Sequence, residues 1–204
     1  METLFAPSVA HDELPAIPGL AYFADYISEN DERSLVRDID QLDWDISWRR
    51  RRQMYGGAYG GGADAPPIPD WGMKIAARIL AEGKTGAPFN SMLVNEYLPG
   101  QGIALHRDYE PFGRTVASLS LLSPCVMDFR HKATDRKERL LLEPRSLLVL
   151  SDVARYEWEH GIAPRKTDQW HGFHWKRGRR LSVTFRTHPG EQRSINGETR
   201  PADL

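Results

Sequence analysis

Hydrophobic residues recur at helical spacing in the first part of the chain. In the segment SENDERSLVRDIDQLDW, Leu35, Ile39 and Leu42 fall on one face of a helix. Ser28 precedes a run of acidic residues, which is the pattern of an N-cap followed by a first turn that favours negative charge. We therefore predict a helix that begins directly after Ser28.

A second helix is predicted from Trp71 to Glu82, with Asp70 as its N-cap and Gly83 after its last turn. The stretch YGGAYGGGADAPPIPDWG, residues 55–72, is rich in glycine and proline and predicts a loop ahead of this helix. The two predicted helices thus lie on either side of an irregular segment.

From Phe89 onward, short β-rich runs replace the helical pattern, and turn residues such as Pro144 separate them. The runs, in chain order, are NSMLVNEYL, VASLSLLS, CVMDF, RLLLEP, SLLVLSD and RLSVTFRT. Helices clustered ahead of many short strands favour a double-sheet jelly roll or barrel with helical support over an alternating α/β fold. We expect a mainly β protein with N-terminal helices.

Composition narrows the class of protein. With 204 residues and a formal net charge of -1, the chain is long enough for one well-buried core. No apolar run approaches the roughly 20 residues of a membrane span, and the first residues lack the pattern of a secretory signal. The only cysteine, Cys125, lies in an apolar run and is interpreted as a buried hydrophobe, which excludes a disulfide framework. We expect a monomeric, cytoplasmic protein with no membrane contact.

The stretch GIALHRDYEP contains the first candidate metal ligands, His106 and Asp108. In a strand these two side chains point the same way and can bind one ion together. An isolated His-x-Asp triplet is more often a surface turn, and a facial-triad iron site needs a second histidine. Our candidate is His160, which follows the apolar run SLLVLSD. The competing downstream histidines lie in polar or charged stretches and are interpreted as solvated: His131, His171 and His174.

The run RLSVTFR places Arg180 and Arg186 on one face, with Ser182 between them, and three apolar residues on the other. An exposed strand with a solvated polar face is the ordinary interpretation of this pattern. Geometry offers a second interpretation. The two arginines are separated by about 20 Å of strand, and each side chain reaches inward by about 6 Å. About 8 Å then remains between the guanidinium groups, which suits a short dicarboxylate. Asn95 and Tyr97 share a face upstream, and either is able to donate to the same ligand.

Three separated stretches, NEYLPGQGIALHRD, SLLVLSDVARYEWEHGI and RRLSVTFR, resemble motifs of the AlkB family of Fe(II)- and 2-oxoglutarate-dependent dioxygenases, in the family's order. The resemblance implies a double-stranded β-helix (jelly roll) core and the oxidation of alkyl groups on nucleobases of DNA or RNA, with Fe(II), 2-oxoglutarate and O2. The residues it assigns to iron are His106, Asp108 and His160. The residues it assigns to 2-oxoglutarate are Asn95, Tyr97, Arg180 and Arg186. Ser182, a further candidate contact for 2-oxoglutarate, stands where the family's last motif often has asparagine.

The arginine run in SWRRRRQMYGG is a candidate contact for nucleic acid. Arg49, Arg50, Arg51 and Arg52 precede Tyr55, a position that resembles the substrate-recognition lid of the family. Four arginines together in a near-neutral protein favour a phosphate-binding patch, although a solvated basic turn explains any one of them equally well. The expected organisation is a single domain over residues 1–204, with helices and lid over about 18–88, a jelly-roll core over about 89–188 and a short polar tail.

The class of nucleic acid substrate is open between two branches. The stretches SLSLLSPCVMDFRH and RYEWEHGI resemble the branch that hydroxylates the tRNA wobble uridine. Glu110, two residues after Asp108, resembles an acidic residue with which repair-type members address the base, and we lean slightly towards oxidative dealkylation. A jelly-roll oxygenase or binding protein without nucleic acid is the third alternative, but such a protein does not call for the arginine run.

Overall fold

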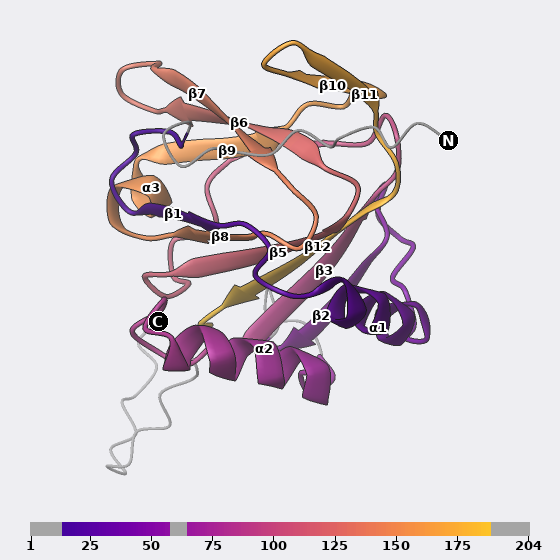
Figure 1. Cartoon of the computed structure of the whole chain (residues 1–204). Helices are drawn as coiled ribbons and strands as arrows, with labels where there is room; N and C mark the ends of the chain where they lie inside the picture. The colour runs from indigo at the N-terminus through magenta and orange to yellow at the C-terminus, as the bar shows by residue number, and fades with distance from the viewer. Residues whose placement is uncertain (1–13, 58–64, 189–204) are drawn as a thin grey trace, which may run out of the picture.

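The computed structural model describes residues 14–57 and 65–188, and the predicted polar tail lies outside them. Two antiparallel sheets face each other, and helices cover the outer face of the larger sheet (Figure 1). The elements in chain order are β1 (Leu20–Phe23), α1 (Glu29–Asp40), β2 (Arg52–Gly56), α2 (Asp70–Ala81), β3 (Ser91–Tyr97), β4 (Ile103–His106), β5 (Val116–Leu122), β6 (Cys125–His131), β7 (Lys137–Leu142), β8 (Leu147–Leu150), α3 (Asp152–Tyr156), β9 (Trp158–Ile162), β10 (Thr167–Trp170), β11 (Phe173–Lys176) and β12 (Arg180–Arg186).

The larger sheet has six strands in the order β1-β8-β5-β12-β3-β2, and the smaller has four in the order β4-β9-β6-β7. Neighbouring strands in the larger sheet come from distant parts of the chain, as β12 lies between β5 and β3. This is a jelly roll with N-terminal helices, so the predicted fold class is confirmed. None of the helices in the described part of the chain is long and apolar enough to cross a membrane.

Helix α1 begins where the sequence predicts. The Asp31 amide donates to the Ser28 hydroxyl oxygen over 3.1 Å, and the Ser28 amide donates to the Asp31 carboxylate over 3.1 Å. This reciprocal capping box satisfies amide groups that the first helical turn leaves without partners. For α2 the prediction of Asp70 as N-cap is wrong, because Pro69 occupies that position and Asp70 is the first helical residue. Its carboxylate there still favours the positive end of the helix.

Two segments expected to be irregular contain strands. Residues Tyr55 and Gly56 end β2, because they pair with Met92 and Ser91 of β3, so the loop predicted over residues 55–72 begins later. Of that loop, residues 58–64 lie outside the described part of the chain. Likewise, the polar link around His171 and His174 forms the hairpin β10–β11, whose turn includes Gly172 at a φ of 85°. Both histidines are exposed in this hairpin, as expected of solvated residues.

Different hydrophobic clusters lie on the two faces of the larger sheet. On its outer face, Ile39 of α1 and Ile79 of α2 pack with Leu181, Val183 and Phe185 of β12 in one apolar cluster. A second cluster fills part of the space between the sheets and includes Phe129, Leu140, Leu142, Leu148 and Trp158. The apolar side of β12 therefore holds the helices, and its polar side turns towards the smaller sheet.

Helix α2 offers a matched test of this packing. Ile79 is 0 % exposed, whereas its neighbour Leu80 is 37 % exposed. We expect Ile79→Ala to lower the free energy of unfolding by about 2–5 kcal/mol, because it opens a cavity under the sheet. The control Leu80→Ala should cost less than about 1 kcal/mol. Urea denaturation followed by circular dichroism measures both, and equal losses would contradict the assigned helix face.

Candidate active site

The polar face of β12 lies inside the sandwich. Arg180, Ser182 and Thr184 are each at most 7 % exposed, so the alternative of a solvated polar face is wrong. These side chains line a small cavity of about 60 Å³ together with His160 from the opposite sheet. A row of buried polar groups between two sheets needs partners, since each unpaired group costs free energy. Any of these groups that lacks a partner within the protein is therefore a candidate contact for a ligand.

Arg180 is the least satisfied of these side chains. Its Nη2 donates to the Ser120 hydroxyl over 2.8 Å, and its guanidinium lies 5.3 Å from the centre of the Tyr97 ring. Its Nε and Nη1 are buried and have no hydrogen-bond partner. A buried guanidinium with no acidic partner matches a carboxylate, and Nη1 together with the second hydrogen of Nη2 forms an end-on fork that can give two parallel hydrogen bonds. This buried cation with unsatisfied donors fits one end of 2-oxoglutarate.

Ser182 has hydroxyl neighbours at the position where an asparagine is common in the family. Its Oγ lies 2.9 Å from Ser118 Oγ on the adjacent strand, and Ser118 Oγ also lies 3.4 Å from Thr184 Oγ1. The three hydroxyls satisfy one another along the floor of the cavity. The departure in sequence thus replaces a long amide side chain by a short network of hydroxyl groups.

Two histidines face each other across the smaller sheet. His106 ends β4 and lies directly opposite His160 of β9, with their ring centres 4.7 Å apart. The Ala104 carbonyl lies 2.9 Å from His106 Nδ1 and can only accept, so Nδ1 carries the proton and Nε2 keeps a lone pair. His160 Nε2 lies 3.6 Å from Asp108 Oδ2. His160 thus lies next to both of the other predicted metal ligands, His106 and Asp108.

The charge states of His160 and Asp108 suit metal ligands. Burial disfavours the charged imidazole and lowers the pKa of His160 to about 4, although Asp108 alone would raise it. Burial would raise the pKa of Asp108, but the Arg186 guanidinium, His160 and Arg155 together lower it to about 2. At neutral pH the pair is a neutral imidazole beside a carboxylate, which are the forms that bind a metal ion.

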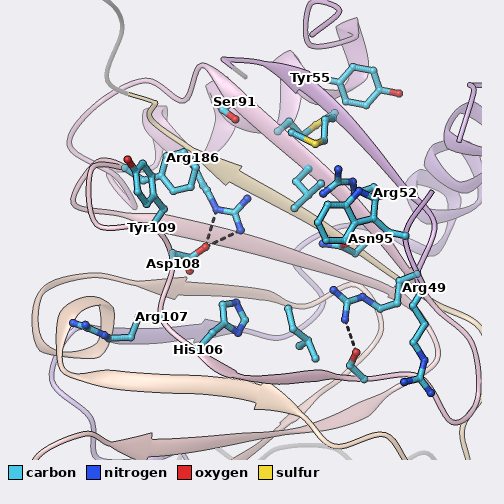
Figure 2. A pocket seen from close by; sticks show the side chains of 18 of the residues that line it. Arg49, Arg52, Tyr55, Ser91, Asn95, His106, Arg107, Asp108, Tyr109 and Arg186 are labelled. Carbon is cyan, nitrogen blue, oxygen red and sulfur yellow. Dashed lines mark hydrogen bonds and ion pairs between the residues drawn. The ribbon is translucent and has the colours of Figure 1, made fainter. Parts of the chain in front are cut away.

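Asp108 is held in this position by contacts that the sequence did not predict. The strand ends at His106, so alternation along β4 does not orient Asp108, which lies in the following loop. Arg186 Nε and Nη2 lie 2.8 Å and 2.7 Å from Asp108 Oδ1 (Figure 2). Among the described residues, no group of three or more His, Cys, Asp or Glu side chains is arranged so that it could hold a metal ion as it stands. Arg186 thus holds one carboxylate oxygen while the other faces His160.

Arg155, which the sequence analysis did not single out, fixes the same loop. It is 2 % exposed, and it donates to the Asp108 carbonyl over 3.0 Å and to the Tyr109 carbonyl over 2.7 Å. In the other direction, Arg107 Nη1 donates to the Tyr156 carbonyl over 2.6 Å. These contacts join the loop to α3. No sequence signal identifies Arg155 in advance, because its partners are backbone atoms that any residue provides.

A larger cavity of about 510 Å³ is lined in part by His106 (Figure 2). Its described lining residues are Trp48, Arg49, Arg50, Arg52, Met54, Tyr55, Gly57, Ser91, Met92, Leu93, Asn95, Gln101, Gly102, Ile103, His106, Arg107, Asp108, Tyr109, Phe112, Pro164 and Arg186. Asn95 lines both this cavity and the smaller one, whereas Tyr97 lines only the smaller one. The larger cavity therefore gives a substrate access to His106 and Asp108.

The four consecutive arginines do not form one patch. Arg51 pairs with the buried Glu96 at 2.5 Å, and Arg52 pairs with Asp45 at 3.0 Å. Arg50 turns inward, lies 5.0 Å from the centre of the Tyr97 ring and donates to the Gly102 carbonyl. Arg49 is exposed and lies at the edge of the cavity (Figure 2). Arg51 is the one of the four that is absent from the cavity lining, because Glu96 holds it.

Tyr109, rather than Glu110, is the loop residue that lines the larger cavity. Glu110 is exposed in a turn and is not among the lining residues, so the structure gives no support to its predicted contact with a base. Tyr109 lies beside Arg186 and Asp108 (Figure 2). Trp48, which was not among the predicted substrate contacts, also lines the cavity and is 59 % exposed. Its place directly before the arginine run is the feature of the sequence that could have identified it.

Residues 19–186 match the model of the 2OG-Fe(II) oxygenase superfamily. Relatives with AlkB homologue names match most of the described chain as well. The chain belongs to the AlkB family of 2OG-Fe(II) oxygenases. An AlkB oxygenase uses Fe(II), 2-oxoglutarate and O2. The histidine pair fits Fe(II), and the unsatisfied donors of Arg180 fit 2-oxoglutarate.

Three similar proteins describe the range of relatives of this AlkB oxygenase. A protein of Acanthamoeba polyphaga mimivirus is 32 % identical over 178 residues, which are 82 % of this chain and 84 % of the viral protein. The Xenopus tropicalis protein named tRNA (carboxymethyluridine(34)-5-O)-methyltransferase alkbh8 is 31 % identical over 82 % of this chain and 28 % of its own length. The Danio rerio protein named probable RNA/DNA demethylase ALKBH6 is 31 % identical over 72 % of this chain and 70 % of its own.

A solved structure supports the fold. The structure of OsALKBH1 covers 83 % of this chain and 98 % of its own with a TM-score of 0.65, at 21 % sequence identity. The chain spans most of the viral protein, but only about a quarter to a half of the length of the relatives named ALKBH8. The AlkB oxygenase therefore corresponds to one part of those longer relatives.

The role of Arg155 can be tested on metal binding itself. We expect Arg155→Met to weaken Mn(II) affinity by roughly 10- to 100-fold, because the loop that carries Asp108 loses its contact with α3. Electron paramagnetic resonance of free Mn(II) during titration measures this affinity without turnover. Arg107→Met, which removes the reciprocal contact from an exposed side chain, is the control and should have a smaller effect. Equal affinities for Arg155→Met and the unaltered protein would contradict the role.

The role of Arg180 can be tested on co-substrate binding. We expect Arg180→Met to abolish the rise in melting temperature that 2-oxoglutarate and Mn(II) cause over Mn(II) alone, and to leave the fold intact, since no protein carboxylate loses a partner. The control is Arg177→Met, which leaves the buried carboxylate of Asp168 without the guanidinium that lies 2.5 Å away. It should lower stability and keep the response to 2-oxoglutarate. A full response in Arg180→Met would refute the carboxylate site.

Proposed function

We propose that this AlkB oxygenase oxidises an alkyl carbon attached to a nucleobase of DNA or RNA, in an oxidative dealkylation. The single observation that carries the proposal is the juxtaposition of the two unpaired donors of Arg180 with the His106–His160 pair, directly below an open cavity. The names of the relatives include RNA/DNA demethylase and DNA N6-methyl adenine demethylase, which supports a nucleobase as the substrate.

The mouth of the larger cavity suits single-stranded nucleic acid. Trp48 is mostly exposed, and the Arg52 guanidinium lies 4.1 Å from the centre of its ring. Arg49 is exposed on the same edge. Enzymes that act on a base take it out of the stack, and they use aromatic faces for bases and cations for phosphates. The mouth offers both kinds of contact.

Different residues are proposed to bind iron, to bind 2-oxoglutarate and to orient the substrate. His106, Asp108 and His160 are the proposed iron ligands, and Arg180 and Arg186 are the proposed partners of the two carboxylates of 2-oxoglutarate, with Asn95, Tyr97 and Ser182 around them. Bound iron, 2-oxoglutarate and O2 supply the oxidant that attacks a substrate C–H bond. The His160 side chain is 13 % exposed and lines the small cavity, so little of it is open to solvent. The larger cavity orients the alkyl carbon towards His106 and Asp108.

Hydroxylation of a tRNA wobble-uridine side chain is the second candidate. The exposed position of Glu110 outside the cavity lining removes the reason that favoured repair over this reaction. Several relatives carry a tRNA methyltransferase name, and the chain covers only about a quarter of their length. Both candidates share the oxidation of a carbon on a base. A monomeric state and a cytoplasmic location remain predictions from the sequence.

Mass spectrometry of nucleosides tests the proposal. We expect the enzyme, supplied with Fe(II), 2-oxoglutarate and air, to convert one modified nucleoside of alkylated DNA, rRNA or tRNA into a dealkylated or hydroxylated product. The Asp108→Ala variant should give no product, because it lacks a proposed iron ligand. Trp48→Ala should reduce product formation and leave the affinity for 2-oxoglutarate unchanged, since Trp48 lies at the mouth of the larger cavity. Consumption of 2-oxoglutarate with no change in any nucleoside would favour a protein or small-molecule substrate instead.

A further inference from the structure

The larger cavity has an unbalanced set of charges. Asp108 is the only acidic residue among its described lining residues, whereas five arginines line it: Arg49, Arg50, Arg52, Arg107 and Arg186. Asp108 already faces Arg186 on one oxygen and His160 on the other. A bound base therefore meets several fixed positive charges and no uncommitted carboxylate in the described part of the lining.

The acidic residues nearest the arginine run are committed elsewhere. Glu96 is buried between Arg51 and Arg179, at 2.5 Å and 2.6 Å. Asp45 faces Arg52 at 3.0 Å. Arg51 and Arg52 are thus neutralised within the protein, and their partners are not available to a ligand. Of the lining arginines for which no acidic partner is found among the described residues, Arg49 and Arg107 are exposed, and Arg50 is the half-buried one.

Arg50 is a fixed cation without an acidic partner among the described residues. Its guanidinium lies over the Tyr97 ring and donates from Nη1 to the Gly102 carbonyl, which holds it in one place. Its Nε is buried and has no hydrogen-bond partner. The same Tyr97 ring lies 5.3 Å from the Arg180 guanidinium, so Arg50 lies close to the proposed co-substrate site. An oxygen acceptor on a substrate fits Arg50, and a cation does not.

We infer that the larger cavity selects nucleobases that carry no positive charge, and that Arg50 imposes this selection. The inference rests on the proposed function and narrows its substrate class. Alkylation of a base at a ring nitrogen creates a fixed positive charge in some products and leaves others neutral. The neutral class includes bases with a carbonyl oxygen beside the alkyl group, and such an oxygen can accept a hydrogen bond from Arg50.

The magnitude of the repulsion exceeds that of the opposing attraction. Two unit charges about 8 Å apart at an effective dielectric constant of about 20 repel by an amount that lowers affinity by roughly 30-fold. Aromatic residues such as Tyr109 attract a cationic base, but a partly exposed cation–π contact raises affinity only about two- to fivefold. One face of the Trp48 ring is already covered by the cationic Arg52. Charge repulsion therefore decides the selection.

A pair of oligonucleotides tests the inference. Two single-stranded RNAs of identical sequence contain one 3-methyluridine, which is neutral, or one 3-methylcytosine, which is cationic at neutral pH. Fluorescence anisotropy with enzyme loaded with Mn(II) and 2-oxoglutarate without oxygen measures both affinities, and the phosphate contribution cancels in their ratio. We expect the neutral base to bind at least about tenfold more tightly. Equal binding, or tighter binding of 3-methylcytosine, would overturn the inference.

Two neighbouring arginines provide matched variants. Arg50→Gln should bring the two affinities to within about threefold of each other, because it removes the charge and keeps a donor. Arg49→Gln should weaken both oligonucleotides together and keep their ratio, since Arg49 is exposed at the mouth. Arg50→Lys retains the charge and should retain the ratio, which separates charge from misfolding. A ratio that is unchanged in a folded Arg50→Gln protein would refute the role of Arg50.

Turnover of the same oligonucleotides separates this inference from the proposed function. With Fe(II) and air, removal of the methyl group from 3-methylcytosine in preference to 3-methyluridine would leave the proposed function intact and overturn the charge selection. If neither methylated oligonucleotide binds more tightly than the unmodified RNA and neither loses its methyl group, base oxidation itself is refuted for this class, and the inference falls with it.

Discussion

A buried guanidinium group that lacks an acidic partner of its own is the constraint on which the site depends. Arg180 lies between the two sheets with two donors unsatisfied, and a sandwich core tolerates such a group only if its surroundings are polar or a ligand completes it. The neighbouring hydroxyls of Ser118, Ser120 and Ser182 supply the polar surroundings. Part of the apolar packing is found instead on the outer face of the larger sheet, where Ile39 and Ile79 pack. The helices thus pack against a strand whose inner face carries the proposed contacts to 2-oxoglutarate.

The segment before β2 shows how charges of one sign can serve different purposes. Arg51 is joined through Glu96 to Arg179, which precedes Arg180 in the chain and also pairs with Asp40 of α1. This network anchors the edge of the larger cavity to the strand that bears the proposed co-substrate site. Arg50, by contrast, remains a charge inside the cavity. Neighbours in sequence therefore contribute separately to structure and to recognition.

The parts of this protein that could be predicted from its sequence are those that depend on local pattern. The alternation along β12 and the capping sequence at Ser28 are local, and both correspond to what the structure contains. Strands β1 (Leu20–Phe23) and β2 (Arg52–Gly56) were missed, because each is short and forms by pairing with a strand distant in the chain. The convergence of His106 and Asp108 was expected from alternation, but Asp108 owes its place to contacts from residues far along the chain. Such contacts leave no periodic trace in the sequence.

The loop after β4 is held to α3 mainly through main-chain atoms. Arg155 donates to the carbonyl groups of Asp108 and Tyr109, and Arg107 donates to that of Tyr156, so these three carbonyl contacts do not depend on the side chains of the accepting residues. Evolution is therefore able to exchange Tyr109 and the exposed Glu110 for other residues while Asp108 keeps its position. A family built in this way can acquire new substrates by single substitutions next to its proposed metal ligands, without first having to rebuild the site.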